Sequence, residues 1–206
     1  MITFKETDVF NFENAIRGAR NPLSSWSKSD SLCSNGNFVM GEQDLIFAKR
    51  LCKAGSDHRK FMRQIFVSVD ILAPLYCWKE FDTYKVGTTA CSTSTMHKIH
   101  SKPFDCQDFS HDKMNTQTLE CLRSMIKHLE ELRLEFISTQ NKIYWYSMIQ
   151  LLPSSYNQMR TCTMSYENLV NMYPARKQHK LDEWIAFCTW IEGLPYAHDL
   201  IVQTTE

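Results

Sequence analysis

The sequence predicts an α+β fold in which a small, mostly antiparallel sheet packs with several long helices. Apolar residues recur at every second position from Ile65 to Ile71, which is the spacing of a buried strand face. A stripe of apolar residues runs at helical spacing from Leu119 to Phe136. Helical patterns outnumber strand patterns along the chain, and this balance is typical of an α+β domain.

The length of 206 residues predicts a single domain that spans residues 1–206. Two loops interrupt it. Residues 23–38 are rich in Ser, Asn and Gly and predict a flexible loop. Residues 100–114, rich in His, Asp and Lys, predict another loop.

The first elements are short. Residues 2–5 alternate and predict an edge strand, and a helix over residues 10–20 follows until Asn21-Pro22 stops it. Residues 41–54 carry an apolar helical face, and Gly55 stands in the C′ position that ends many helices.

The centre of the chain begins with the strand at residues 64–72. Ala73-Pro74 then places a proline at the first position of a helix that runs to about Asp82. Glu80 and Asp82 face different sides of this helix, so we expect one of them to be solvated or salt-bridged. The remaining predictions are an extended or looped segment at 83–99, helices at 116–138 and 141–152, an extended piece at 160–164, and helices at 165–173 and 181–192.

The composition excludes several classes of protein. Lys+Arg and Asp+Glu balance at 23 each, so we expect no nucleic acid polymer as a partner. The longest apolar run is broken by polar residues and is too short to span a membrane. Eight scattered cysteines without a CxxC spacing predict reduced thiols and no metal site. The expected location is the cytoplasm of a bacterium or of the host of a virus.

The most distinctive segment is Thr88–Lys98, in which six of eleven residues carry a hydroxyl group. Hydroxyl side chains compete with the backbone for hydrogen bonds, which disfavours a helix. Beside Lys85, His97 and Lys98 they suit a loop that donates to a phosphate. The alternative is an ordinary solvated loop or edge strand.

Read in order, the motifs resemble a known family. Glu13-Asn14-Ala15-Ile16-Arg17 and Asp44-Leu45-Ile46 begin the resemblance, and Phe66–Lys85 carries its best part. Leu152-Pro153-x-Ser155 follows, and the last matching positions are Ser165, Glu167, Leu169, Asn171, Arg176 and Trp184. Together these residues resemble the flavin-dependent thymidylate synthases, the ThyX family, over about four fifths of the chain.

The resemblance implies where ligands would bind. Thr83-Tyr84-Lys85 stands at the family's Arg-His-Arg triplet for the flavin, and Glu167 stands at a family cation. Neither a hydroxyl nor a phenol replaces the bidentate contact of a guanidinium with a phosphate. The residues implied in nucleotide or flavin binding are Lys79, Glu80, Tyr84, Lys85, Thr88, Ser92, Ser94, His97, Lys98, Asn171, Arg176 and Lys180.

The family resemblance implies a divergent flavin-dependent thymidylate synthase-like protein. It would bind a pyrimidine nucleotide such as dUMP, with FAD as cofactor, at the subunit interfaces of a homotetramer. If active, it would methylate and reduce the nucleotide, although no catalytic residue is assigned. The first alternative is a catalytically inactive protein of a virus, phage or mobile element that binds or sequesters the nucleotide. The second is a structural oligomer without a ligand.

Overall fold

The computed structural model describes residues 1–205 and divides into two compact units. Unit 1 contains Met1–Thr3, Ile71–Thr83 and Cys91–Thr161. Unit 2 contains Phe4–Asp70, Tyr84–Ala90 and the chain from Cys162 onward. The expectation of a single domain stays a prediction.

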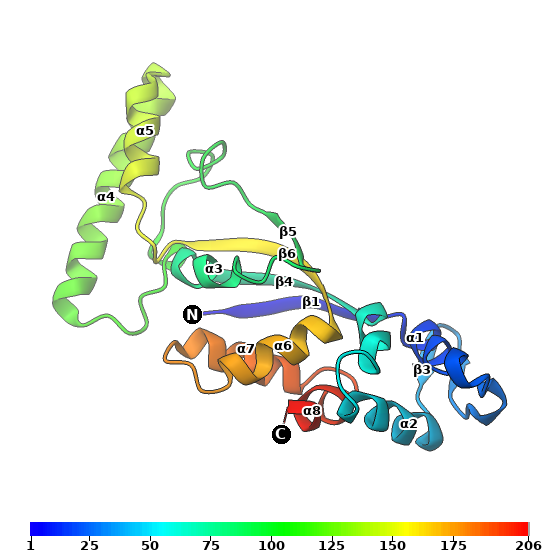
Figure 1. Cartoon of the computed structure of the whole chain (residues 1–206). Coiled ribbons are helices and arrows are strands. Elements are labelled where there is room, and N and C mark those ends of the chain that lie inside the picture. The colour runs from blue at the N-terminus through cyan, green and yellow to red at the C-terminus, as the bar shows by residue number, and fades with distance from the viewer. Residues whose placement is uncertain (206) are drawn as a thin grey trace. The chain divides into compact units, whose positions relative to one another are not determined.

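Four strands form the main sheet in the order β1-β4-β6-β5 (Figure 1). Their bounds are Thr3–Phe10 for β1, Phe66–Pro74 for β4, Asn157–Ser165 for β6 and Thr89–Ser92 for β5. In β4 every second side chain is buried, as the alternation in the sequence predicted. The first strand is an edge strand, also as predicted, but it continues to Phe10. The small antiparallel sheet and the many helices confirm the α+β fold.

Helices make up much of unit 2. These are α1 (Phe12–Ala19), α2 (Glu42–Lys53), η3 (Arg59–Gln64), α6 (Tyr166–Arg176), α7 (Asp182–Glu192), η5 (His198–Val202) and α8 (Gln203–Thr205). Gly55 follows α2 with φ +100°, which confirms the left-handed C′ position. Helix α6 begins at a capping box between Ser165 and Asn168. It passes the predicted end at Tyr173, because a proline in the last turn removes only one helical hydrogen bond.

The loop prediction for residues 23–38 is wrong in part. Two short helical turns, η1 (Asn21–Leu23) and η2 (Trp26–Lys28), precede a hairpin of β2 (Leu32–Ser34) and β3 (Asn37–Val39). Asn35 and Gly36 connect the strands with φ +51° and +79°. Positive φ at both central residues is the requirement of a type I′ turn, and Asn-Gly meets it.

A buried ion pair holds the same region of unit 2 to α2. Arg20 donates to Asp44 at 2.6 Å, and the two side chains are 4% and 0% exposed. Ser29 and Ser31 also donate to this carboxylate, each at 2.6 Å. Burial acts to raise the pKa of Asp44, but the hydrogen bonds from the two serines and Arg20 outweigh it and lower the pKa.

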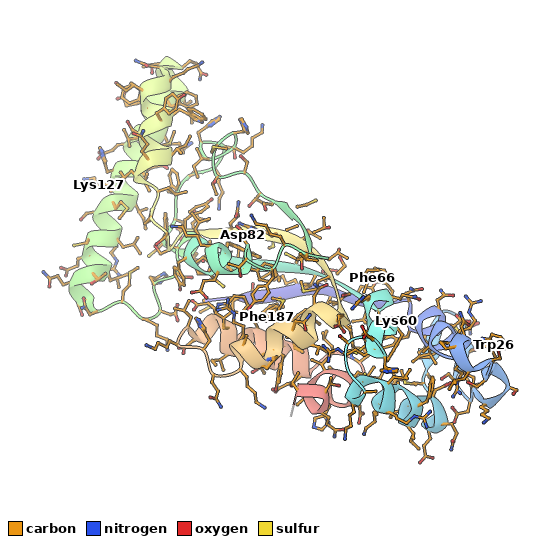
Figure 2. The ribbon with its side chains drawn as sticks, in the orientation of Figure 1. Trp26, Lys60, Phe66, Asp82, Lys127 and Phe187 are labelled. Atoms are coloured by element: carbon orange, nitrogen blue, oxygen red, sulfur yellow. The ribbon has the colours of Figure 1, made fainter. Side chains whose placement is uncertain are left out.

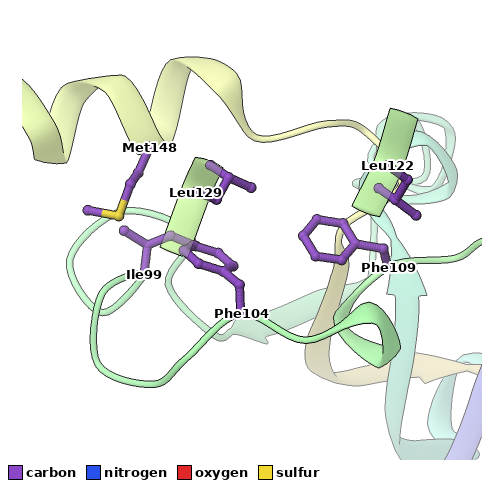
Figure 3. Close-up of a cluster of buried hydrophobic side chains, with 6 residues drawn as sticks. All are labelled: Ile99, Phe104, Phe109, Leu122, Leu129 and Met148. Atoms are coloured by element: carbon purple, nitrogen blue, oxygen red, sulfur yellow. The ribbon is translucent and has the colours of Figure 1, made fainter. Parts of the chain in front are cut away.

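Unit 1 contains α3 (Leu75–Phe81), the short turn η4 (Cys106–Asp108), α4 (Thr116–Thr139) and α5 (Lys142–Leu151). Helices α4 and α5 lie side by side in Figure 1. Figure 3 shows a cluster of buried apolar side chains in this unit: Ile99, Phe104, Phe109, Leu122, Leu129 and Met148. The rest of the predicted apolar stripe of α4 packs against these side chains. Trp145 packs against this cluster and donates its indole N–H to the carbonyl of Met96 at 3.0 Å.

Candidate functional site

Each of the two compact units contains a different part of the predicted set of site residues. In unit 2, the structure brings Tyr84 and Arg176 together. Arg176 donates from Nε to the Tyr84 hydroxyl at 2.8 Å. The same guanidinium lies over the ring of Trp184, with Cζ 4.1 Å from the ring centroid. Arg176 is therefore held by a phenol oxygen and an aromatic face within its own unit.

The loop after Tyr84 is anchored to the first turn of α6. Asn168 donates to the carbonyl of Val86 at 2.7 Å and accepts from the backbone of Ser165 at 3.0 Å. Gly87 has φ +74°, and a Cβ added there would lie 3.1 Å from Asn168 Oδ1. A glycine is thus required both by conformation and by the close approach of the amide.

Two predicted residues of this loop differ in environment. Lys85 is exposed, and its ammonium group has no ion pair within residues 1–205. The hydroxyl of Thr88 is buried and lacks a hydrogen-bond partner among the same residues. A buried polar atom of this kind marks a place where a ligand or a water would be stabilising.

Glu167 does not present a free charge. Glu167 is 7% exposed, and its carboxylate accepts a hydrogen bond from Nε of Arg59 at 2.9 Å. Arg59 begins η3, and sequence reasoning missed it. The only available signal was that a buried carboxylate in α6 needs a cation from another segment. The pair removes the repulsion that a lone carboxylate would exert on a nearby phosphate.

The other predicted residues of unit 2 lie on the surface. Asn171 is exposed on α6, and Lys180 is exposed shortly before α7. The intervening Lys177 places its ammonium 5.3 Å from the Tyr173 ring centroid. The basic run 176–180 is thus divided between stacked and solvent-facing cations.

In unit 1, a cleft of about 390 Å³ contains two of the predicted residues, Ser94 and Lys98. Other donors and acceptors share its wall: Thr93, Ser101, Lys102, Gln107, Asp108, Tyr156 and Asn157. Leu72, Ile99 and Met159 complete the lining with apolar surface. The cleft therefore brings hydroxyl, amide and ammonium groups together with apolar side chains, and small-ligand sites likewise combine apolar surface with placed polar groups.

The loop that forms this cleft is held firmly to β6. Thr93 donates its N–H to the carbonyl of Met159 at 2.9 Å, and its own carbonyl accepts from Gln158 at 2.6 Å. Ser94 accepts from the backbone N–H of His97 at 2.8 Å and so closes a tight turn. This turn sets the position of Lys98 on the cleft wall.

The two lysines of the cleft are not equivalent. Lys102 forms an ion pair with Asp108, and this hydrogen bond raises the pKa of Lys102. Lys98 has no ion pair in the part of the chain that the structure describes. Its charge is therefore available to an anionic ligand, whereas the charge of Lys102 is already balanced.

The remaining predicted residues lie in α3, at the end of β5 and in the loop after β5. Lys79, Ser92 and His97 are exposed, and Glu80 is half-buried. Thr83 donates its hydroxyl to the carbonyl of Glu80 at 2.7 Å.

The expected salt bridge is found at Asp82. Asp82 follows α3 and is labelled in Figure 2, and its carboxylate accepts a hydrogen bond from Arg160 at 2.6 Å. The Arg160 guanidinium also lies 4.3 Å from the centroid of the Trp78 ring. This confirms that one of the two carboxylates is a salt-bridged group.

Residues 1–205 offer no metal site, no disulfide bond and no membrane-spanning helix. Those residues contain no group of His, Cys, Asp and Glu suited to a metal ion. All eight cysteines are free thiols. No helix among them has the length and apolar character needed to cross a bilayer.

Comparison with known proteins extends these observations. No sequence-family model and no curated protein sequence matches the chain. Two solved structures of flavin-dependent thymidylate synthase ThyX from Helicobacter pylori, both with FAD and dUMP, match with TM-scores of 0.70 and 0.69. Each is 16% identical in sequence, and the matches cover 100% of this chain and 99% and 98% of those chains.

A third similar structure is that of a nucleotide methylase. The UMP/dUMP methylase PolB from Streptomyces cacaoi, bound with 5-Br dUMP, matches with a TM-score of 0.68 at 12% identity. The match covers 98% of this chain and 95% of that one. The chain therefore has the fold of the flavin-dependent thymidylate synthases, as the resemblance in its sequence implied.

Proposed function

We propose that this chain binds a pyrimidine nucleotide of the dUMP type, with its phosphate in the unit 1 cleft beside Lys98. The observation that carries the proposal is the ammonium group of Lys98, which has no ion pair among the described residues and shares the cleft wall with hydroxyl and amide groups. A charge-assisted contact with a phosphate is about twice as strong as a neutral hydrogen bond. The solved structures of similar fold that hold dUMP or 5-Br dUMP give the proposal further support.

The same cleft offers groups for a pyrimidine ring. The side-chain amide of Gln107 can both donate and accept, as the edge of uracil requires. Asn157 is less available, because its Oδ1 accepts from Ser110 at 2.8 Å. Tyr156 supplies a ring held edge-on against Phe109, with 5.5 Å between centroids. A fixed aromatic face suits stacking by a base.

A bound flavin fits this chain less well than a nucleotide alone. Tyr84 already accepts from Arg176, and Thr83 donates to the carbonyl of Glu80. Glu167 carries a negative charge that Arg59 balances. Of the triplet at 83–85, only Lys85 offers a cation, so the residues present do not reproduce a flavin phosphate site. We therefore assign nucleotide binding or sequestration, without a step through a flavin.

The second candidate function is flavin-dependent methylation of the nucleotide. One observation favours it: the fold matches over the whole chain with structures that hold both FAD and dUMP. A yellow protein with flavin absorbance, or one that takes up added FAD, would support this function. A colourless protein that binds dUMP but not FAD would remove it.

We also propose that the chain assembles as a homotetramer. Large apolar side chains stand exposed on α4 and α5, among them Leu134 at 54%, Ile143 at 62% and Tyr146 at 53%. Exposed apolar surface of this kind is typical of a contact with another protein chain.

Titration calorimetry tests nucleotide binding. Lys98→Ala should weaken dUMP binding at least tenfold, or about 1.4 kcal/mol. Deoxyuridine, which lacks the phosphate, should bind both proteins equally. Lys127→Ala is the matched control, since Lys127 is an exposed lysine of α4, labelled in Figure 2, that does not line the cleft. Equal dUMP affinity of the wild type and Lys98→Ala would disprove the assignment.

A further inference from the structure

We infer that a second pocket, in unit 2, binds a small organic cation. The pocket lies where the turn between β1 and α1 meets the β2–β3 hairpin and has a volume of about 600 Å³. This volume is within the range of small-molecule sites. None of its lining residues lines the proposed nucleotide cleft. The inference is therefore independent of the proposed function.

The charged side chains of the lining are both acidic, and a guanidinium outside the lining, that of Arg17, donates to Oδ1 of the lining residue Asn14 at 2.7 Å. Asp8 in β1 and Glu13 in the first turn of α1 contribute carboxylates, and no lysine or arginine belongs to the lining. A hydrogen bond with Glu13 raises the pKa of the neighbouring Cys33 thiol, which stays neutral. Two carboxylates without a cation on the wall attract a positively charged ligand.

Aromatic rings line the same pocket. The rings of Phe12 and Phe38 are nearly parallel, with centroids 5.9 Å apart and an interplanar angle of 2°. Tyr196 meets Phe12 edge-on, with 5.4 Å between centroids. Phe10 also lines the pocket and is 42% exposed. The face of an aromatic ring attracts a cation, and ammonium ligands are recognised by rings and carboxylates together.

The pocket wall is fixed before any ligand arrives. The Tyr196 hydroxyl accepts the N–H of Met40 at 2.9 Å, which sets the ring beside the hairpin. Asn14 donates to Asn11 at 2.7 Å, and Asn11 donates to the carbonyl of Gln64 at 2.8 Å. A site that is already ordered loses less conformational entropy when the ligand binds. The ligand class is thus a protonated or quaternary amine joined to a flat or apolar body.

Three probes with a common ring separate charge from apolar contact. Benzyltrimethylammonium, benzyl alcohol and benzoate would each be titrated into the full chain and followed by amide chemical shifts of Gly36 and Asn37. The cation should bind at least fivefold more tightly than the alcohol. Benzoate is the opposing probe, because the positive end of the α1 dipole favours an anion. Equal binding of all three, or tighter binding of benzoate, would overturn the inference.

Charge-neutral variants test the wall itself. Asp8→Asn and Glu13→Gln should each weaken the ammonium probe at least threefold and leave benzyl alcohol unchanged. Phe38→Ala should weaken both ligands. Glu42→Gln removes an exposed carboxylate of α2 outside the lining and should change nothing. The amide spectrum reports whether each variant is folded. Unchanged ammonium affinity in folded Asp8→Asn and Glu13→Gln would also overturn the inference.

Discussion

Nε of Arg59 lies 2.9 Å from Oε2 of Glu167, and this contact joins η3 to α6 across a sequence separation of 108 residues. Both side chains are largely buried, at 17% and 10% exposure. A buried ion pair contributes little compared with an apolar pair of the same shape, whereas the loss of one partner is costly.

We therefore expect Arg59→Met to destabilise the protein by about 3 kcal/mol, because the variant leaves a carboxylate buried without its cation. The double variant Arg59→Met/Glu167→Leu should regain most of this loss. Urea unfolding measures both changes. If the single variant loses less than about 0.5 kcal/mol, then Glu167 is solvated and the pair is incidental.

Asp44 should give the stability a component that depends on pH. Its pKa is lowered in the folded state from the ordinary value of 3.8. The stabilisation is fully present above the unfolded pKa and is lost as the pH falls through the folded pKa. Thermal unfolding between pH 7 and pH 3 should show this loss in the wild type and a smaller one in Asp44→Asn. Asp57→Asn, an exposed control, should follow the wild type.

Gly87→Ala should destabilise the protein by about 2 kcal/mol, from a positive φ and from crowding against Asn168. Gly36→Ala separates the two causes. It has φ +79° but nothing within 4 Å of an added Cβ, so its cost should be about 1 kcal/mol. Chemical unfolding of both variants provides the comparison. Equal losses would mean that Asn168 moves aside freely.

Leu129→Ala should be strongly destabilising, by about 2–5 kcal/mol. Leu129 is 0% exposed and lies in the cluster of Figure 3. Arg123→Ala, on the exposed face of the same helix, should stay within about 0.5 kcal/mol of the wild type. Guanidinium unfolding measures the loss of stability in both variants. If Leu129→Ala loses as little stability as Arg123→Ala, the cluster collapses around the missing side chain.

The proposed tetramer predicts a change in mass when its apolar surface is charged. Leu134→Glu and Ile143→Glu should each convert the assembly into smaller species, because a carboxylate is costly to bury in an apolar contact. Light scattering after size exclusion measures the mass. A wild-type protein that is monomeric at all concentrations would contradict the tetramer.

Much of the fold was predictable from local signals. The apolar stripe of α4 and the left-handed position of Gly55 depend on residues close together in the sequence. The hairpin was missed, although Asn35-Gly36 is a strong turn signal, because its flanking strands are short and exposed.

The candidate site was harder to predict, because its contacts join distant segments. The sequence indicated Ser94 and Lys98 as ligand residues, and both line the unit 1 cleft. It did not indicate that Arg176 is stacked on Trp184 or that Arg59 balances Glu167. Spacing along a chain carries no information about such pairs, since they depend on how the elements pack.

Asn168 has a consequence for local opening. Its amide group joins the Val86 carbonyl to the first turn of α6, although the two segments are 82 residues apart. An opening that frees the loop at 84–87 must therefore break the same amide that completes the helix cap. Such shared hydrogen bonds define a cooperative opening unit. In a hydrogen-exchange experiment, the backbone amides of the loop and of the first turn of α6 should lose protection together.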